Sequence, residues 1–240
     1  MIKLINSAEE INEYSKIDLF SVRIKSILKA YGTSYGFASF YCQYDGDNNI
    51  TSIMSKLDGD ITISYNNHCD LCETAQFIKA VGFNSVFTDE GFNFESRFTS
   101  GIIMSTNKKP DIFPVYAELD EYPKLMDLFN FTDYETSDFE LWYADVSHRI
   151  RHNCAKAYTL CINEEIISSG MFSAMYDDCA VLSAVKTQQE FRGLGYGSAL
   201  VGAMMNDIKS TVFLMRDNDK NESFYKRLGF ENTGIWRIYK

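Results

Sequence analysis

One segment in the C-terminal half restricts the possible folds more than any other. From Val185 to Leu200 an apolar run passes through a turn with glycines at 193, 195 and 197 and continues into small and apolar residues. Glycine tolerates positive φ and lets a ligand approach the backbone closely, so successive N–H groups can turn inward at a helix N-terminus. The segment therefore predicts a strand, an anion-binding turn and a helix, in that order.

The spacing of these glycines excludes two common nucleotide sites. Gly193, Gly195 and Gly197 do not form the Gly-x-Gly-x-x-Gly pattern of dinucleotide-binding folds, and no Gly-Lys-Ser/Thr follows them. We therefore expect neither a dinucleotide site nor a P-loop at this turn.

The flanking segments predict a mixed α/β (α+β) fold. Three apolar runs at 157–162, 166–175 and 179–185 are separated by the pairs Glu164-Glu165 and Asp177-Asp178, as in an antiparallel meander. Strands and helices mix without strict βαβ alternation, which favours a mixed, largely antiparallel sheet flanked by helices. The further elements that we expect are helices at 119–129, from a capping box at Ser137 and Glu140, at 197–208 and at 222–228, with strands at 212–215 and 234–239.

The N-terminal half repeats part of this order more faintly. Its expected elements are helices at 22–30 and 71–81 and β-like runs at 37–44, 50–54, 60–64 and 85–88. A polar stretch with Pro110 indicates a boundary, which divides the chain into domains 1–112 and 113–240. A degenerate second copy is one interpretation, but residue identity between the halves is poor, so the repeat stays open.

The position of the glycine turn is taken in the N-terminal half by His68-Cys69-Asp70-Leu71-Cys72. A structural zinc site needs a second pair of ligands at suitable spacing, and none follows, so this segment is expected to be the start of a helix. It has no glycine. We therefore expect no metal, and no coenzyme bound by this half.

Two motifs of the C-terminal half resemble those of a known family. Arg192, Gly195 and Gly197 match the Arg-x-x-Gly-x-Gly/Ala acyl-coenzyme A loop of the GNAT acetyltransferases. The segment 218–230 resembles the family's Asn-x-x-Ala-x-x-Phe-Tyr-x-x-x-Gly-Phe, with Asn221 where Ala is usual. The resemblance implies an acyl-CoA N-acyltransferase fold in the C-terminal half, and one interpretation of the N-terminal half is a degenerate GNAT-like copy in tandem with it.

The same resemblance implies an enzyme, an acyltransferase that moves the acetyl group of acetyl-CoA to a primary amine of an unidentified acceptor. The backbone N–H of Val185 would bind the carbonyl oxygen and Thr187 the pantetheine arm. The pyrophosphate would lie on the amides of Arg192, Gly193, Leu194, Gly195, Tyr196, Gly197 and Ser198, and Asn218 would contact the cofactor arm. Tyr225 matches the general acid; a phenol with a pKa of about 10 can protonate a thiolate near 8.5 over a short hydrogen bond, although a packed aromatic is the alternative.

The acceptor side carries less specific signals. An amine with a pKa near 10.4 is about one part in 2,500 neutral at pH 7, so a base, a water relay or an acceptor of lower pKa is needed. Candidate bases are Glu140, Asp145 and Glu190, with solvated surface charge as the alternative. Trp142 and Tyr143 are candidate acceptor-binding residues, with core packing as the alternative. A different function stays open: a catalytically silent module that binds acyl-CoA.

Charge and composition restrict the classes of partner that we expect. The formal net charge of -10 argues against nucleic acid, which requires clustered Lys and Arg. A negative net charge suits a cationic partner, such as a small-molecule or peptide amine. The need for solubility alone also explains this charge. No secretory signal and no membrane span are recognised, and the six cysteines are scattered, so we expect reduced thiols in the cytoplasm. A homodimer is possible.

Overall fold

The structure is a computed structural model that describes residues 1–111, 115–132, 138–218 and 220–240. The boundary expected between residues 112 and 113 and the expected cap Ser137 lie outside these residues. The chain forms two compact units. Unit 1 comprises Met1–Ile103, Met215–Asn218 and Thr233–Lys240, and unit 2 comprises Met104–Leu214 and Asp219–Asn232.

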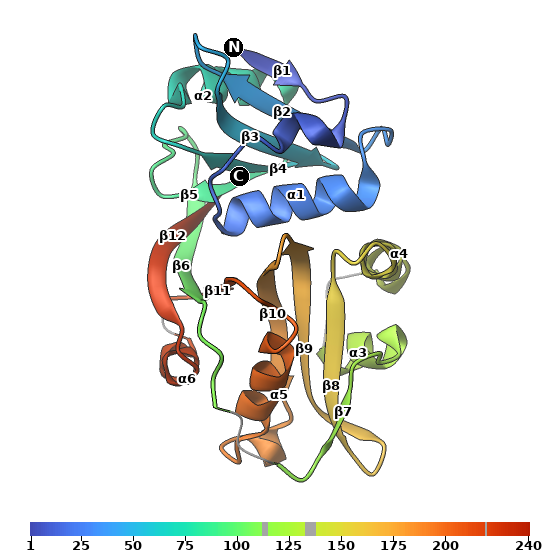
Figure 1. Ribbon diagram of the computed structural model, residues 1–240. Helices are drawn as coiled ribbons and strands as arrows, with labels where there is room; N and C mark the ends of the chain where they lie inside the picture. Colours follow the sequence, from blue (N-terminus) through green and yellow to red (C-terminus); the bar gives the residue numbers. More distant parts are fainter. Residues whose placement is uncertain (112–114, 133–137, 219) are drawn as a thin grey trace. The chain divides into compact units, whose positions relative to one another are not determined.

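Unit 2 is built on strands in the order β11-β10-β9-β8-β7 (Figure 1). The predicted meander is confirmed: β8 (Lys156–Ile162), β9 (Glu165–Tyr176) and β10 (Cys179–Thr187) pair antiparallel. β11 (Val212–Arg216) runs parallel to β10, and β7 (Glu118–Asp120) is antiparallel to β8. The sheet is therefore mixed and mostly antiparallel.

Two tight turns set the register of the meander. Asn163 and Glu164 connect β8 to β9, and Asp177 and Asp178 connect β9 to β10. All four residues have positive φ. Two successive positive φ angles are the mark of the type I′ turn, whose twist matches that of the flanking strands.

Helices cover both faces of these strands. Val146 of α4 (Phe139–Arg151) packs with Met171 of β9 on one face, to which α3 (Leu125–Thr132) also contributes. The neighbouring residue Gly170 faces the other way, toward Met204 of α5 (Tyr196–Met205). The remaining elements of unit 2 are α6 (Glu222–Arg227) and the 3-10 helix η2 (Gln189–Phe191).

The helix predicted over 119–129 is wrong at its start. Leu119 lies in β7, opposite Leu160 of β8, and α3 begins only at Leu125. Two physical reasons combine: the open edge of β8 offers hydrogen bonds to an extended segment, and Pro123 lacks the N–H that a helix interior requires.

Unit 1 has strands in the order β1-β2-β3-β4-β5-β12-β6. On adjacent positions of β3, Ile53 belongs to the apolar cluster of α1 (Leu19–Tyr31) and Met54 to that of α2 (Leu71–Val81), so these helices cover opposite faces. The other elements are η1 (Ala8–Ile11), β1 (Ile2–Leu4), β2 (Ala38–Tyr44), β3 (Ile50–Leu57), β4 (Asp60–Tyr65), β5 (Ser85–Asp89), β6 (Phe98–Thr106) and β12 (Glu231–Tyr239).

The order of elements in unit 1 recurs in unit 2. In each, a meander ends in a strand that is joined through a helix to a parallel neighbour: β4-α2-β5 in unit 1 and β10-α5-β11 in unit 2. The units do not follow chain order, however. Residues Trp236–Tyr239 of β12, the last strand, pair antiparallel with Val86–Asp89 of β5. The C-terminal strand is therefore part of unit 1.

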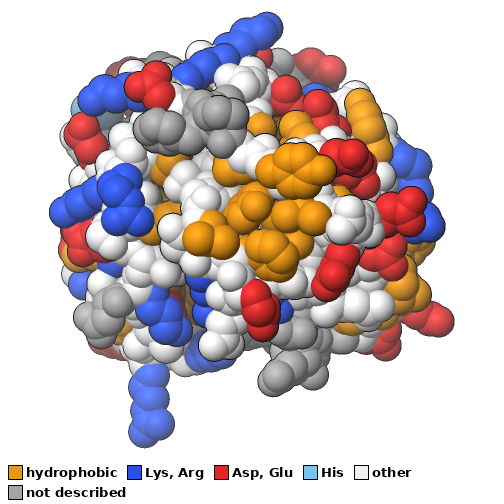
Figure 2. Space-filling model, turned by 90° about the horizontal axis from the view of Figure 1, so that it is seen from below, with side chains coloured by type: hydrophobic (Ala, Val, Ile, Leu, Met, Phe, Trp, Pro, Cys, Tyr) orange, Lys and Arg blue, Asp and Glu red, His pale blue; other side chains and the backbone are white. Residues whose placement is uncertain are grey.

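The surface carries charge of both signs. Figure 2 shows Lys and Arg as well as Asp and Glu side chains on one face, around a central group of hydrophobic side chains. The net charge of the chain therefore does not give the charge of any one site. In the part of the chain that the structure describes, no helix is long and apolar enough to cross a membrane, and the six cysteines are unpaired.

Candidate active site

Strand β10 separates from β11 partway along its length. The two strands pair from Ala180–Val212 to Leu182–Leu214, and in the described residues β10 then continues to Thr187 without β11. A strand edge released in this way can form hydrogen bonds with an extended ligand. The arm of a long ligand can therefore lie along the end of β10.

A β-bulge lies where the strands separate. Ser183 is opposite Met171 and Lys186 is opposite Ser169, so Ala184 and Val185 together face Gly170. Ala184 has a φ of 52°, which is unusual for a residue other than glycine. A bulge leaves one residue out of the ladder. This geometry suits the expected role of the Val185 N–H, which stays a prediction.

The turn after β10 leaves the N-terminus of α5 open. Gly195 caps the helix with a φ of 90°, no side chain caps it, and its first turn has no acidic residue. A Cβ on Gly197 would lie 3.0 Å from Thr187 Oγ1, so glycine lets α5 start close against β10. Thr187 is held in turn by Ser168, whose Oγ lies 2.9 Å from Thr187 Oγ1. The exposed amides and the helix dipole favour an anion here.

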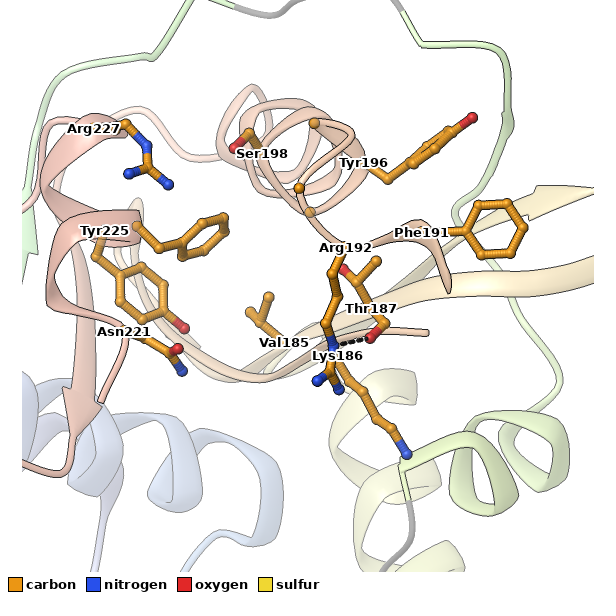
Figure 3. Close-up of a pocket in the computed structure, with 14 residues that line it drawn as sticks. Val185, Lys186, Thr187, Phe191, Arg192, Tyr196, Ser198, Asn221, Tyr225 and Arg227 are labelled. Atoms are coloured by element: carbon orange, nitrogen blue, oxygen red, sulfur yellow. Dashed lines mark hydrogen bonds between the residues drawn. The ribbon is translucent and has the colours of Figure 1, made fainter. Parts of the chain in front are cut away.

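These elements enclose a pocket of about 590 Å³ in unit 2. Figure 3 shows its walls: the end of β10, the turn with the start of α5, and α6. Its lining consists of Val185, Lys186, Thr187, Phe191, Arg192, Gly193, Gly195, Tyr196, Gly197, Ser198, Asn221, Phe224, Tyr225 and Arg227.

The lining is cationic although the chain is acidic. Among the described residues, the lining contains Lys186, Arg192 and Arg227 and no Asp or Glu. Arg192 is oriented by a 3.0 Å hydrogen bond from its Nε to the carbonyl oxygen of Thr187, and Lys186 Nζ donates to the carbonyl oxygen of Phe131 at 2.6 Å (Figure 3 shows the first). This charge fits a ligand with several phosphates, such as coenzyme A.

Tyr225 lies at the inner side of the pocket. Its side chain is 9% exposed and packs against Phe224 and Phe230. Burial raises the pKa of the phenol to about 12, and no hydrogen bond to a described residue contributes to the shift. Figure 3 shows the ring pointing into the pocket. The hydroxyl is thus protonated at neutral pH and directed into the pocket.

Most of the cofactor-binding residues predicted from the motifs line this pocket. Two do not: the side chain of Leu194 is 63% exposed, and Asn218 belongs to unit 1. Sequence reasoning missed Lys186, Phe191, Asn221, Phe224 and Arg227. A signal existed for three of them: Asn221, the N-cap of α6, and Phe224 and Arg227 within the helix recur at intervals of three, a spacing that places residues on one side of a helix.

The residues predicted for the acceptor side lie outside the pocket lining. Trp142 packs its ring 5.3 Å from that of Phe129, and Tyr143 is 46% exposed. Of the candidate bases, Asp145 forms an ion pair with Arg149, while Glu140 and Glu190 are exposed. Their acceptor-binding and catalytic roles stay predictions.

The corresponding place in unit 1 is built differently. The Asp70 side chain caps α2 by accepting from the N–H of Glu73 at 2.9 Å, so carboxylates occupy that helix N-terminus. The pairing of β3 with β4 has no bulge, and the Tyr65 hydroxyl at the end of β4 donates to Asp89 of β5. A phosphate group would meet negative charge at this helix start.

Comparisons with known proteins agree with this geometry. The model of the Acetyltransferase (GNAT) family matches residues 116–230. A search of curated protein sequences gave no match.

Solved structures share the fold along the whole chain. A Drosophila protein superimposes with a TM-score of 0.63 at 15% identity, over 99% of this chain and 97% of that one. A tandem GNAT protein from the clavulanic acid biosynthesis pathway gives 0.59 at 9% identity, over 100% and 98%. A GNAT-family acetyltransferase from Colwellia psychrerythraea gives 0.55 at 12%, over 100% of both chains. Residues 116–230 thus form a domain of the Acetyltransferase (GNAT) family, and the whole chain shares the fold of these solved structures.

Proposed function

We propose that this protein is an acetyl-CoA-dependent N-acetyltransferase that acts on a primary amine. The observation that carries the proposal is a single pocket that combines the released edge of β10, the open N-terminus of α5 and the buried phenol of Tyr225. Acetyl-CoA supplies an activated acyl group as a thioester. The acceptor is a small molecule or a peptide amine.

Different residues of the pocket bind different parts of acetyl-CoA. The amides of the turn from Arg192 to Ser198 hold the pyrophosphate, and Thr187 and the edge of β10 hold the pantetheine arm. The N–H of Val185, at the bulge, binds the carbonyl oxygen and stabilises the negative charge that develops there during attack by the amine. The presence of Val185, Thr187 and most of the turn in the lining of one pocket supports these roles.

Tyr225 acts as the general acid. The amine nitrogen forms a bond to the carbonyl carbon, the carbon–sulfur bond breaks, and the leaving thiolate takes the phenolic proton. The amine loses a proton in the same turnover, so the phenolate can be reprotonated and the charges balance. Tyr225 is protonated at neutral pH, and its place in the pocket lining supports this role.

One cofactor per chain is expected. The pocket lies in unit 2, and in unit 1 Asp70 and Glu73 take the place of the open amides. The six unpaired cysteines support a reducing compartment such as the cytoplasm.

A thermal-shift titration with acetyl-CoA tests the proposal, with Gly195→Glu as the variant. We expect wild type to be stabilised by about 3 kcal/mol at 100 times the dissociation constant. Gly195→Glu should show no shift, because it places a carboxylate at the anion site and a side chain at a φ of 90°. Glu118→Gln, a change at an exposed residue outside the pocket lining, serves as a control and should behave as wild type.

Turnover is measured as thiol release with a panel of primary amines. Release that depends on the amine supports the enzyme. Cofactor binding without release for any amine would favour a silent acyl-CoA-binding module, and no binding by folded wild-type protein would refute both.

A further inference from the structure

The pocket contains more positive charge than a pyrophosphate requires. The open amides of α5 already provide an anion site, yet Arg192 and Arg227 also line the pocket, and no carboxylate of the residues that the structure describes does. Figure 3 shows the Arg227 guanidinium on the α6 wall, toward the first turn of α5, and Arg192 on the opposite wall. Positive groups on two walls indicate a ligand with more than one phosphate site.

Arg227 differs from the lysine beside it. Lys226 Nζ forms an ion pair with Glu222 at 2.6 Å, the usual arrangement of residues four apart on a helix. Arg227 has no carboxylate partner among the described residues, and it lines the pocket whereas Lys226 does not. The chain has 33 acidic residues, so an arginine left without one beside a cationic pocket indicates that its partner is the ligand.

The positions of Tyr225 and Arg227 along α6 indicate which part of the ligand each residue would contact. Tyr225 is buried at the inner side, where the thioester is expected, while Arg227 ends α6 and is exposed at the rim. A ligand whose thiol end lies inside and whose pyrophosphate lies on the α5 amides presents its next anionic group outside them. In coenzyme A that group is the 3′-phosphate of the ribose, a monoester with a charge of about −1.5 to −2 at pH 7.

We propose that Arg227 binds the 3′-phosphate of coenzyme A and makes the protein select coenzyme A over its 3′-dephospho form. This inference rests on the proposed function, because it concerns the same pocket. The planar guanidinium can donate two parallel hydrogen bonds to one phosphate, which a lysine cannot match.

The test compares dissociation constants for coenzyme A and 3′-dephospho-coenzyme A by titration calorimetry. For wild type we expect coenzyme A to bind about tenfold more tightly, the lower end for a hydrogen bond to a charged group, since the site is exposed. Arg227→Gln should weaken coenzyme A about tenfold and leave the dephospho form within about twofold of wild type. Arg227→Lys should keep part of the preference.

Lys226→Gln is the matched control, because it removes a neighbouring positive charge that does not line the pocket. It should keep the wild-type ratio, and added salt should reduce the ratio for wild type.

Other outcomes overturn the assignment. If Arg227→Gln weakens the binding of both ligands equally, Arg227 contacts the pyrophosphate instead. An unchanged ratio makes it an ordinary cation at a helix C-terminus. Wild-type protein that binds both forms equally refutes this inference alone, and wild-type protein that binds neither refutes the proposed function with it.

Discussion

The chemistry at Tyr225 depends on its immediate surroundings more than on its identity. An unburied phenol has a pKa of about 10, and burial between Phe224 and Phe230 raises that of Tyr225 to about 12. The neutral form predominates below the pKa. The folded protein therefore keeps the phenol of Tyr225 protonated over the pH range in which amines become neutral.

Replacing Tyr225 by Phe should lower kcat about 100-fold while coenzyme A affinity stays within about threefold, because only the proton is lost. Steady-state thiol release and calorimetry measure the two quantities. In the wild type, the pH profile of kcat should show no fall due to Tyr225 up to about pH 11. Equal rates for Tyr225→Phe and wild type would show that the ring only packs against the cofactor.

Single residues also show what a sequence motif can predict. Val185, Thr187, Gly195 and Tyr225 belong to motifs whose spacing reports backbone geometry, and all four line the pocket, while their roles stay predictions. Lys186 and Arg227 were missed, because whether a cation faces solvent or a cavity depends on the elements that pack around it.

At the scale of elements, two helices with the same place in the chain order have different N-termini. α5 begins at Gly195 with free amides, and α2 begins at Asp70, whose carboxylate accepts from the N–H of Glu73. Capping satisfies the orphan donors that an anion would otherwise use. The cap therefore stabilises the start of α2, whereas the start of α5 stays open to an anion.

Asp70→Ala should reduce the free energy of unfolding by about 1 kcal/mol, the usual cost of losing an N-cap. Urea denaturation measures it, with the exposed Asp47→Ala as a comparison. Calorimetry should still give one coenzyme A per chain. A second site in the variant would show that capping alone had blocked unit 1.

A cluster around Lys156 joins β8 to the segments that follow β7 and α5 in unit 2. Lys156 Nζ lies 2.6 Å from Glu121 Oε2 and 2.5 Å from Asp207 Oδ2, and the Tyr158 hydroxyl donates to Asp207 at 2.6 Å. Burial acts to raise the pKa of Asp207, but the hydrogen bonds from Lys156 and Tyr158 outweigh it and leave the pKa below its usual value. The carboxylate form is thus favoured by folding.

Stability from this cluster should disappear in acid. A carboxyl whose pKa is lower in the folded chain stabilises it above the unfolded pKa, near 3.9, and loses this contribution as the pH falls through the folded value. Unfolding free energies at pH 7 and pH 3 should therefore differ less in Asp207→Asn than in wild type. The same pH dependence in both proteins would show that Asp207 contributes nothing.

At the scale of the whole molecule, the chain returns to unit 1 at its end. β12 pairs with β5, and Tyr239 is 1% exposed there, with its hydroxyl donating to the carbonyl oxygen of Phe92 at 2.6 Å. During synthesis, unit 1 therefore lacks β12 until residues 233–240 have been added. A fragment that ends near residue 112 omits that strand.

Tyr239→Ala should destabilise unit 1 by about 3–5 kcal/mol, as for a large aromatic removed from a core. Hydrogen exchange should accelerate at Val86–Asp89, the partners of β12. Leu200→Ala, a buried change in α5, should affect β9 and β10 instead. Unchanged exchange in β5 would contradict the membership of β12 in unit 1.

Local patterns sufficed for the meander, the helices α2, α4 and α5, and the motif residues of the pocket, since each depends on the periodicity and turn chemistry of a short segment. The start of α3 was mispredicted and β7 was missed, because the partner edge on β8 overrides a weak helical pattern. The place of β12 and the direction of Arg227 depend on residues far apart in the chain. Packing and strand pairing set both, because the energy that holds them comes from contacts that no short segment contains.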